Sequence, residues 1–250
     1  MVQATSGVTR NLWMRKQSGL YAPMRRNFPI NGLALYAPLW HPELNTSPFL
    51  SKDLNAHSCT VTGATWGIQG RTFDGIDDIV TIPAATVLNN ISPLSALAWI
   101  YPDTLGDLSA ARIFHKAPAD SNNGWILNLA TNNVMSFSVA WSGVPGNLVR
   151  DTANNAITLG AWQLVCVTWT GNMAYTEVLF YVGGVETSYG AFGTSTGSRK
   201  DDSASSLYVG DRGDAGRSFD GIIGEVFIYS RVLSALEIQH IYQATKWRYV

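Results

Sequence analysis

The sequence predicts an all-β fold, in which two antiparallel sheets pack face to face, with one short C-terminal helix and an extended N-terminal arm. Short runs that are apolar or alternate in polarity recur along the 250 residues from about residue 31 onward. The breaks between them are rich in Gly, Asn, Asp and Pro, as tight turns require. No helices alternate with these runs, which favours an antiparallel sandwich over a parallel sheet.

The composition agrees with one domain of this class. Hydrophobic residues make up 46% of the chain, and 23 glycines accompany nine Trp, nine Phe and ten Tyr. Aromatic residues suit strands, and a chain of this length can bury a large core. The net charge of −1 gives no general attraction to nucleic acid, and no apolar run reaches the about 18 residues of a membrane helix. We therefore expect neither nucleic-acid nor membrane binding.

The predicted strands follow from the spacing of these runs, and some runs also predict which faces are buried. In 163–169, one face carries Val165, Val167 and Trp169 and the other is apolar too, so this strand belongs in the middle of a layered structure or under covering loops. The run 134–141 alternates large apolar residues with Ser and Ala, as a half-buried strand does. The full set of predicted strands is 32–39, 58–63, 71–75, 78–83, 94–102, 111–116, 124–131, 133–141, 161–170, 176–184, 205–211 and 224–230.

The predicted helix begins after Ser234. Ser234 and Glu237 have the spacing of a capping box, in which each side chain satisfies a backbone N–H of the first turn. Ala235, Ile238, Ile241 and Tyr242 then form one apolar stripe that can pack on the sandwich. Two cysteines, at 59 and 166, make no disulfide framework, and we expect two separate buried thiols.

Residues 1–30 form a basic arm, distinct from the domain predicted over 31–250. The arm carries five basic residues and no acid, so with a total of −1 the remaining 220 residues carry −6. It lacks the apolar core of a secretion signal. We expect it to anchor the domain on other copies of the chain or on an acidic protein surface. Its predicted contact residues are Arg10, Trp13, Arg15, Lys16, Tyr21, Arg25 and Arg26.

One phrase occurs twice: Gly-Arg-(Thr/Ser)-Phe-Asp-Gly-Ile begins at residue 70 and again at residue 216. We expect Phe73 and Phe219 to point into the core and the following aspartates to satisfy local backbone donors. Because the two copies lead into an early and a late strand, those strands are expected to lie side by side and close one sheet.

The order of motifs resembles laminin G-like domains of the concanavalin A-like jelly-roll family, over about residues 31–245. The resemblance is carried by "RTFDGIDDIVTIP" from residue 71, "SALAWIYP", "WQLVCVTWTG", "VLFYVGGVE" and the closing "GRSFDGIIGEVFIYSRVLSALEIQHIY". It implies a jelly roll of two sheets with about six or seven strands each. Pentraxins, which are related, place a half-cystine where Cys166 falls, but the partner strand "SALAWIYP" has no Cys, so that disulfide is not expected here.

The resemblance implies several functions, and the side chains must decide among them. Glycoside hydrolysis needs two carboxylates that flank one bond, whereas the five glutamates at 43, 177, 186, 225 and 237 are isolated. We therefore predict a non-enzymatic structural or adhesive surface protein, similar to the appendage or decoration proteins of phage virions, that docks on a capsid or tail protein. The alternatives are an extracellular carbohydrate-binding lectin, with or without calcium, and, more remotely, a glycoside hydrolase.

Two sets of site residues are predicted. Calcium prefers clustered carboxylate oxygens in loops, and the resemblance implies calcium in many relatives, so Asp77, Asp78, Asp211 and Asp214 are candidate ligands; solvated turn acids are the alternative. Glycans on cell surfaces would be bound by aromatic rings at a loop rim, for which Trp141, Tyr189 and Phe192 are candidates. The long, glycine-rich segment 186–204 is the predicted recognition loop.

Overall fold

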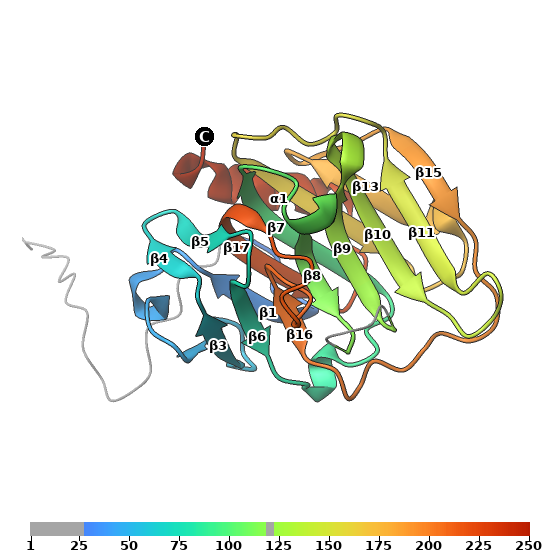
Figure 1. The fold of residues 1–250 in the computed structure, drawn as a ribbon, viewed down its shortest axis with the longest axis horizontal. Coiled ribbons are helices and arrows are strands. Elements are labelled where there is room, and N and C mark those ends of the chain that lie inside the picture. The colour runs from blue at the N-terminus through green and yellow to red at the C-terminus, as the bar shows by residue number, and fades with distance from the viewer. Residues whose placement is uncertain (1–27, 119–122) are drawn as a thin grey trace, which may run out of the picture.

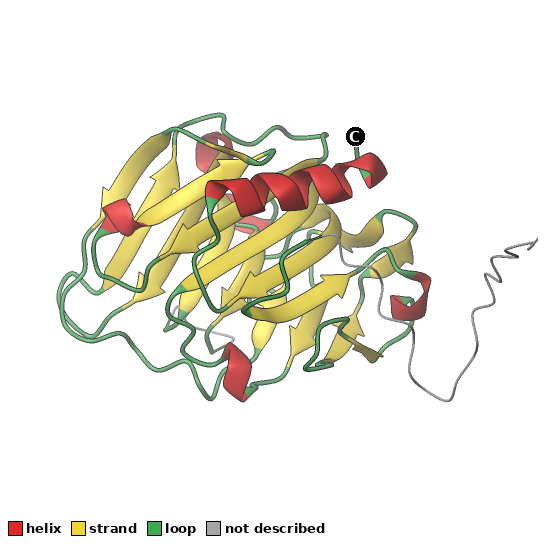
Figure 2. Ribbon diagram, turned by 180° about the vertical axis from the view of Figure 1, so that it is seen from behind, coloured by secondary structure: helices red, strands yellow, loops and turns green. Residues whose placement is uncertain are grey.

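The computed structural model describes residues 28–118 and 123–250. Two antiparallel sheets stack on each other, and α1 crosses the outer face of one of them (Figures 1 and 2). The predicted antiparallel sandwich is therefore confirmed. The predicted arm residues Arg10, Trp13, Arg15, Lys16, Tyr21, Arg25 and Arg26 lie outside the described residues.

The first sheet has eight strands in the order β14-β13-β12-β7-β17-β5-β4, with β1 also paired to β17. Its strands are β1 (Leu33–Pro38), β4 (Thr65–Gly67), β5 (Gly70–Asp74), β7 (Leu94–Pro102), β12 (Gln163–Trp169), β13 (Val178–Val182), β14 (Val185–Glu186) and β17 (Asp220–Tyr229).

The second sheet has nine strands in the order β15-β11-β10-β9-β8-β16-β6-β3-β2. Its strands are β2 (Phe49–Leu50), β3 (Ser58–Thr62), β6 (Ile79–Ile82), β8 (Arg112–Lys116), β9 (Trp125–Ala130), β10 (Val134–Ala140), β11 (Asn147–Thr152), β15 (Tyr189–Gly193) and β16 (Leu207–Val209). The helices are α1 (Ala235–Thr245) and the 3₁₀ turns η1 (Pro42–Leu44), η2 (Thr86–Leu88), η3 (Asp107–Ser109), η4 (Thr131–Asn133), η5 (Tyr175–Glu177) and η6 (Lys246–Arg248).

Every predicted strand is present, and five further strands raise the count above six or seven per sheet. The added strands, β2, β4, β11, β14 and β15, are short or polar. Three of them, β2, β4 and β14, have only two or three residues and end a sheet. Such strands leave little periodic signal in a sequence because they pair on one side and bury few side chains.

The central strands of the first sheet are buried on both faces. Val165, Val167 and Trp169 of β12 belong to the core between the sheets, whereas Leu164 and Cys166 belong to a second apolar layer beneath α1, as predicted. The helix starts with the predicted capping box, in which Ser234 Oγ accepts from Glu237 N–H. Both cysteines are free and buried, which confirms that prediction.

The two copies of the repeated phrase are antiparallel partners. Asp220 faces Asp74, and Gly221 faces Phe73, in the β17–β5 pair. Phe73 and Phe219 are buried and meet edge to face at 6.2 Å, which confirms their core role. Asp74 Oδ1 accepts from Ile76 N–H at 2.9 Å, as expected of a turn aspartate. Asp220 differs, because its Oδ2 accepts from the Thr104 hydroxyl and not from a backbone donor.

Candidate functional site

Two of the three predicted glycan-binding residues lie together at one edge of the second sheet. Tyr189 and Phe192 belong to β15, the edge strand, and Tyr175 of η5 completes the group. The Phe192 ring stacks on the Tyr175 ring with centroids 3.9 Å apart and planes 18° apart. Phe192 nevertheless remains 58% exposed. We call Arg150, Tyr175, Tyr189 and Phe192 the aromatic platform.

Arg150 holds the three aromatic residues of the platform in position. It lies on β11 directly opposite Phe192, because β11 pairs with β15 in that register. Its guanidinium carbon lies 3.5 Å from the centroid of the Tyr189 ring, and Nη1 donates to the carbonyls of Tyr175 and Val178 at 3.1 and 2.5 Å. A cation over an aromatic face and two charge-assisted hydrogen bonds stabilise this arrangement. The platform is thus a preformed surface.

Tyr189 adds a polar group at the side of the platform. Its hydroxyl donates to Glu186 Oε1, and burial, together with this hydrogen bond, raises the pKa of Tyr189 well above its ordinary value. The hydroxyl therefore stays protonated at neutral pH. An exposed apolar ring flanked by a hydroxyl and a carboxylate can pack against the apolar face of a sugar and bond to its hydroxyls.

Trp141, the third predicted residue, lies apart from this platform. It is only 8% exposed and packs in the core between the sheets. Just beyond β10, it makes an isolated antiparallel bridge with Arg199. Its phase with Phe137 and Val139 along β10 accounts for this burial. The structure therefore leaves Tyr189 and Phe192 as the predicted aromatic residues at the surface.

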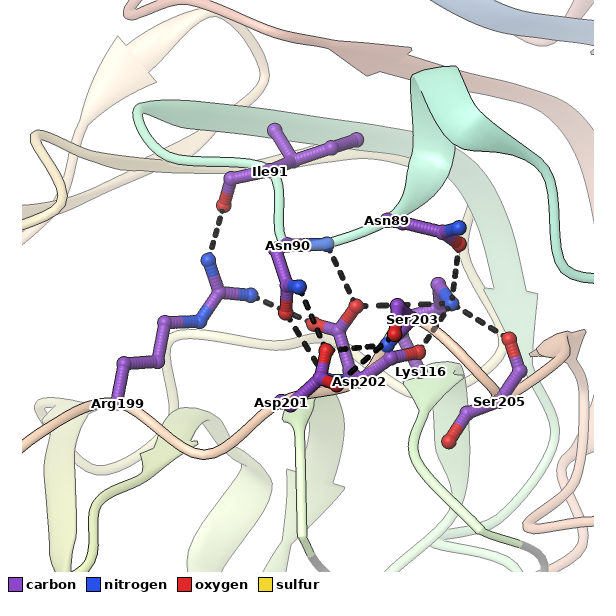
Figure 3. A network of polar contacts seen from close by, with 9 residues as sticks. All are labelled: Asn89, Asn90, Ile91, Lys116, Arg199, Asp201, Asp202, Ser203 and Ser205. Carbon is purple, nitrogen blue, oxygen red and sulfur yellow. Dashed lines mark hydrogen bonds and ion pairs between the residues drawn. The ribbon is translucent and has the colours of Figure 1, made fainter.

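The predicted recognition loop is partly a strand and partly pinned to the sandwich. β14 and β15 take up much of its first half, and a buried polar network holds the second half (Figure 3). Asp202 is completely buried, and its Oδ2 accepts from Arg199 Nη2 at 2.6 Å. Its Oδ1 accepts from Asn90 N–H at 2.7 Å. Lys116 Nζ donates to the carbonyls of Asp202 and Ser205.

This network joins three distant segments. Arg199 Nη1 donates to the Ile91 carbonyl at 2.7 Å, and Lys116 Nζ lies 3.6 Å from Asp202 Oδ1. Burial lowers the pKa of Lys116, and the charge of Asp202 opposes that effect. Charges taken out of water in this way persist only when their partners are in place. The loop between β15 and β16 is therefore held rigid at its β16 end.

Three aspartates form an acidic group in the turn after β5. One carboxylate oxygen of each of Asp74, Asp77 and Asp78 lies within 4.8 Å of the other two. Asp78 Oδ2 accepts from Asp74 N–H at 2.9 Å. Burial raises the pKa of Asp78, and the charges of Asp74 and Asp77 add to this effect. The group offers the oxygen ligands that calcium prefers, although the backbone already uses one oxygen of Asp74 and one of Asp78.

Asp211 and Asp214, the other predicted calcium ligands, are engaged elsewhere. Asp214 forms a two-pronged ion pair with Arg212, with N–O distances of 2.9 and 2.6 Å. Asp211 is buried and accepts from Gly213 N–H and the Ser218 hydroxyl. Ser218 also donates to the Ile76 carbonyl, so this turn lies against the acidic group. Asp77 and Asp78 therefore share a group with Asp74 and not with Asp211 and Asp214.

Sequence reasoning missed Arg150 and Tyr175. Arg150 lies in β11, whose mixed sequence Asn-Leu-Val-Arg-Asp-Thr has no clear strand pattern. Tyr175 lies in η5, just before β13 of the first sheet, and its ring reaches Phe192 of β15, the edge strand of the second sheet. The sequence offered one weak signal: Arg150 and Tyr175 lie in segments next to predicted strands, where side chains can reach the surface of a sheet edge. None of the described helices is long and apolar enough to span a membrane.

Comparisons with known proteins agree on the fold. A family model described as the concanavalin A-like lectin/glucanases superfamily matches residues 74–239. The binding domain of Paraclostridial mosquitocidal protein 1 is 13% identical, with a TM-score of 0.61 over 84% of this chain and 52% of that one. Trypanosoma rangeli sialidase is 14% identical, with a TM-score of 0.60 over 88% of this chain and 34% of that one. A comparison with curated protein sequences finds no match.

Another similar structure is matched over its whole length. Domain 4 of AbnA, a GH43 extracellular arabinanase from Geobacillus stearothermophilus, was solved in complex with arabinotriose. It is 18% identical, with a TM-score of 0.55 over 86% of this chain and 100% of that one. The chain thus spans about half of the mosquitocidal binding domain and a third of the sialidase, but the whole of AbnA domain 4. At these identities the similarity establishes a shared fold.

Proposed function

Because the chain belongs to the concanavalin A-like lectin/glucanases superfamily, we propose that it is a non-enzymatic carbohydrate-binding domain whose ligand packs on the aromatic platform. The observation that carries this proposal is the Phe192 ring, which is stacked on Tyr175 and yet 58% exposed. An exposed aromatic ring loses little side-chain entropy on binding when its orientation is already fixed in the free protein. Arg150 and the β11–β15 register provide that hold.

The similar structures support a binding role in general terms. One is a domain of an arabinanase bound to arabinotriose, and others are binding domains of toxins. The sialidase among them is about three times as long as the part this chain covers. We propose that the present chain likewise recognises a glycan and leaves chemistry to other domains or proteins.

The test is a glycan array, followed by calorimetry with the best neutral oligosaccharide. Phe192→Ala is expected to weaken binding about tenfold, because a ring contact of this kind is worth about 1–2 kcal/mol. Val144→Ala is the control, since Val144 is also apolar and 93% exposed but lies on a different loop. Equal affinity of Phe192→Ala and the parent protein would refute the platform as the binding surface.

We also propose that glycan binding depends on a bound calcium ion. Asp74, Asp77 and Asp78 would hold the ion, which would neutralise their charge and fix the turn after β5. The array is therefore repeated with calcium and with a chelator. Binding that survives chelation, together with an unfolding temperature unmoved by calcium, would show that the acidic group is a set of solvated turn acids.

For the wider setting we propose an exposed position on a particle or cell surface, such as a phage virion, with residues 1–30 as the anchor. The support is the charge division between the arm, at +5, and the remaining 220 residues, at −6. Removing residues 1–27 leaves Phe28 in place against Tyr36 and Phe227. Light scattering is expected to report a smaller assembly after that removal. Unchanged assembly would contradict an anchoring arm.

A further inference from the structure

A second aromatic surface lies at the C-terminal end of the chain. The guanidinium carbon of Arg248 lies 3.2 Å from the ring centroid of Trp40 and 4.4 Å from that of Trp247. Trp40 follows β1, whereas Trp247 and Arg248 belong to η6, which follows α1. We call Trp40, Trp247 and Arg248 the tryptophan–arginine ladder.

The chain end that carries the ladder is anchored to the first sheet. The Tyr249 ring stacks on Trp99 at 4.4 Å and also contacts Trp162 at 4.6 Å. Gln69 of the β4–β5 turn donates to the Arg248 carbonyl at 3.3 Å. With its neighbour Tyr249 buried in this way, Arg248 is held in a fixed position and is not part of a loose tail.

A buried carboxyl group lies beneath the ladder. Glu225 of β17 is 2% exposed, and its Oε1 accepts from Trp40 Nε1 at 2.6 Å. Arg248 Nε approaches the same oxygen only to 3.9 Å. Glu225 Oε2 and the Tyr249 hydroxyl, both buried, have no hydrogen-bond partner among the residues that the structure describes. Glu225 thus orients Trp40 and attracts Arg248 without using the hydrogen-bonding capacity of the guanidinium.

The terminal nitrogens of Arg248 are not used within the described part of the chain, and its side chain is 17% exposed. Among residues 28–118 and 123–250, none accepts a hydrogen bond from these nitrogens. Trp247 beside it is 69% exposed, and its indole nitrogen is occupied by the Ala244 carbonyl. A planar fork of N–H donors next to a largely exposed indole combines two different recognition elements: one for a carboxylate and one for an apolar ring face.

We propose that the tryptophan–arginine ladder is a separate binding site for sugar acids, that is, glycans with a carboxylate on a pyranose ring. The carboxylate would take the two terminal nitrogens of Arg248, and the sugar ring would pack on Trp247. Trp40 keeps the guanidinium plane in position. Lys246, the neighbouring cation, lies over the Tyr242 ring and is not part of the proposed site.

This site is distinct from the aromatic platform. Figure 1 shows the C-terminus at one end of the molecule and β15 at the other. The two sites differ in how the arginine is used: Arg150 lies over the Tyr189 ring and donates from Nη1 to two backbone carbonyls, whereas no described residue accepts from the terminal nitrogens of Arg248. The ladder can therefore bind sugar acids whether or not the platform binds neutral glycans.

The experiment compares acidic glycans with neutral ones by calorimetry on the full chain. The probes are 3′-sialyllactose against lactose, trigalacturonate against its methyl ester, and acetate alone. We expect the acidic sugars to bind, and their neutral counterparts and acetate to bind at least about tenfold more weakly. Arg248→Lys, which keeps the charge but loses the fork, and Trp247→Ala are each expected to weaken binding about tenfold or more.

Two matched controls separate this proposal from the others. Lys246→Ala removes a neighbouring cation, and Phe192→Ala removes the platform; both are expected to keep sugar-acid affinity within about twofold. Thermal unfolding of each variant shows that it is folded, which is expected for the exposed Trp247. The proposal is overturned by equal binding of neutral and acidic sugars, by acetate binding as tightly, by unchanged affinity in Arg248→Lys, or by no binding up to about 10 mM.

Discussion

Replacing Glu225 by Gln is expected to stabilise the protein at pH 8 and to have little effect at pH 5. Burial raises the pKa of Glu225 from its ordinary value of 4.5 to about 7, although the hydrogen bond from Trp40 and the charge of Arg248 both act against this. The folded protein therefore holds a proton on Glu225 over a pH range in which the unfolded chain has already lost it. Stability from this group is complete below pH 4.5 and is lost as the pH rises through about 7.

The size of the effect follows from the same two values. One pKa unit corresponds to about 1.4 kcal/mol, so the free energy of unfolding should fall by about 3 kcal/mol between pH 5 and pH 8 because of this one group. The amide side chain introduced by Glu225→Gln carries no charge at any of these pH values. It can keep the acceptor oxygen for Trp40 Nε1, and its NH₂ group can reach toward the unpartnered Tyr249 hydroxyl.

Urea denaturation at pH 5, 6, 7 and 8 measures the difference between Glu225→Gln and the parent protein. Titrations shared by both proteins cancel in that difference. Glu43→Gln is the control, since Glu43 forms a surface ion pair with Lys52 and its loss should cost at most about 1 kcal/mol at any pH. The reasoning fails if the parent and Glu225→Gln lose stability in parallel from pH 5 to pH 8.

Further predictions concern the buried network and the core. Lys116→Met removes the donor that the buried carbonyls of Asp202 and Ser205 share, although Arg199 still pairs with the Asp202 carboxylate. The free energy of unfolding should fall by about 2–4 kcal/mol, measured by urea denaturation; a loss below about 1 kcal/mol would contradict the network. Gly210→Ala should destabilise strongly, because φ is +90° and the new Cβ would overlap the Phe73 ring. Its unfolding temperature should fall by several degrees more than that of Gly183→Ala, where φ is also positive but no atom lies nearby.

The layered fold could be predicted from the sequence, because burial on one or both faces of a strand leaves a clear pattern. The strand 94–102 has the predicted bounds, and β12 has both predicted faces. The short edge strands could not be predicted, since their pairing depends on neighbours from distant parts of the chain. β15, an edge strand, and β11 beside it also lack a strong apolar alternation: β15 is positioned by β11, and β11 by β10 and β15.

The candidate sites were accessible to sequence reasoning only in part. Tyr189 and Phe192 were found because they flank glycines in a long segment. Tyr175 and Arg150 were not, since their role arises from contacts with β15, which is distant from both in the sequence or paired only in the folded sheet. The ladder joins Trp40 to Arg248 across some two hundred residues, a contact that no local pattern encodes. Trp141 was predicted to lie at the surface of a loop, but it continues the inward-facing alternation of β10 and is buried.

The pairing of the two copies of the repeated phrase has a consequence for how the chain can fold during synthesis. β17 lies between β7 on one side and both β5 and β1 on the other. β1 and β5 are among the first strands to leave the ribosome, yet their partner is the last strand of the sheet. The edges of β1 and β5 that pair with β17 therefore remain without a partner until residue 229 has been synthesised. Sequence separation of this size predicts slow folding, and nascent chains that end before β17 should depend on chaperones to stay soluble.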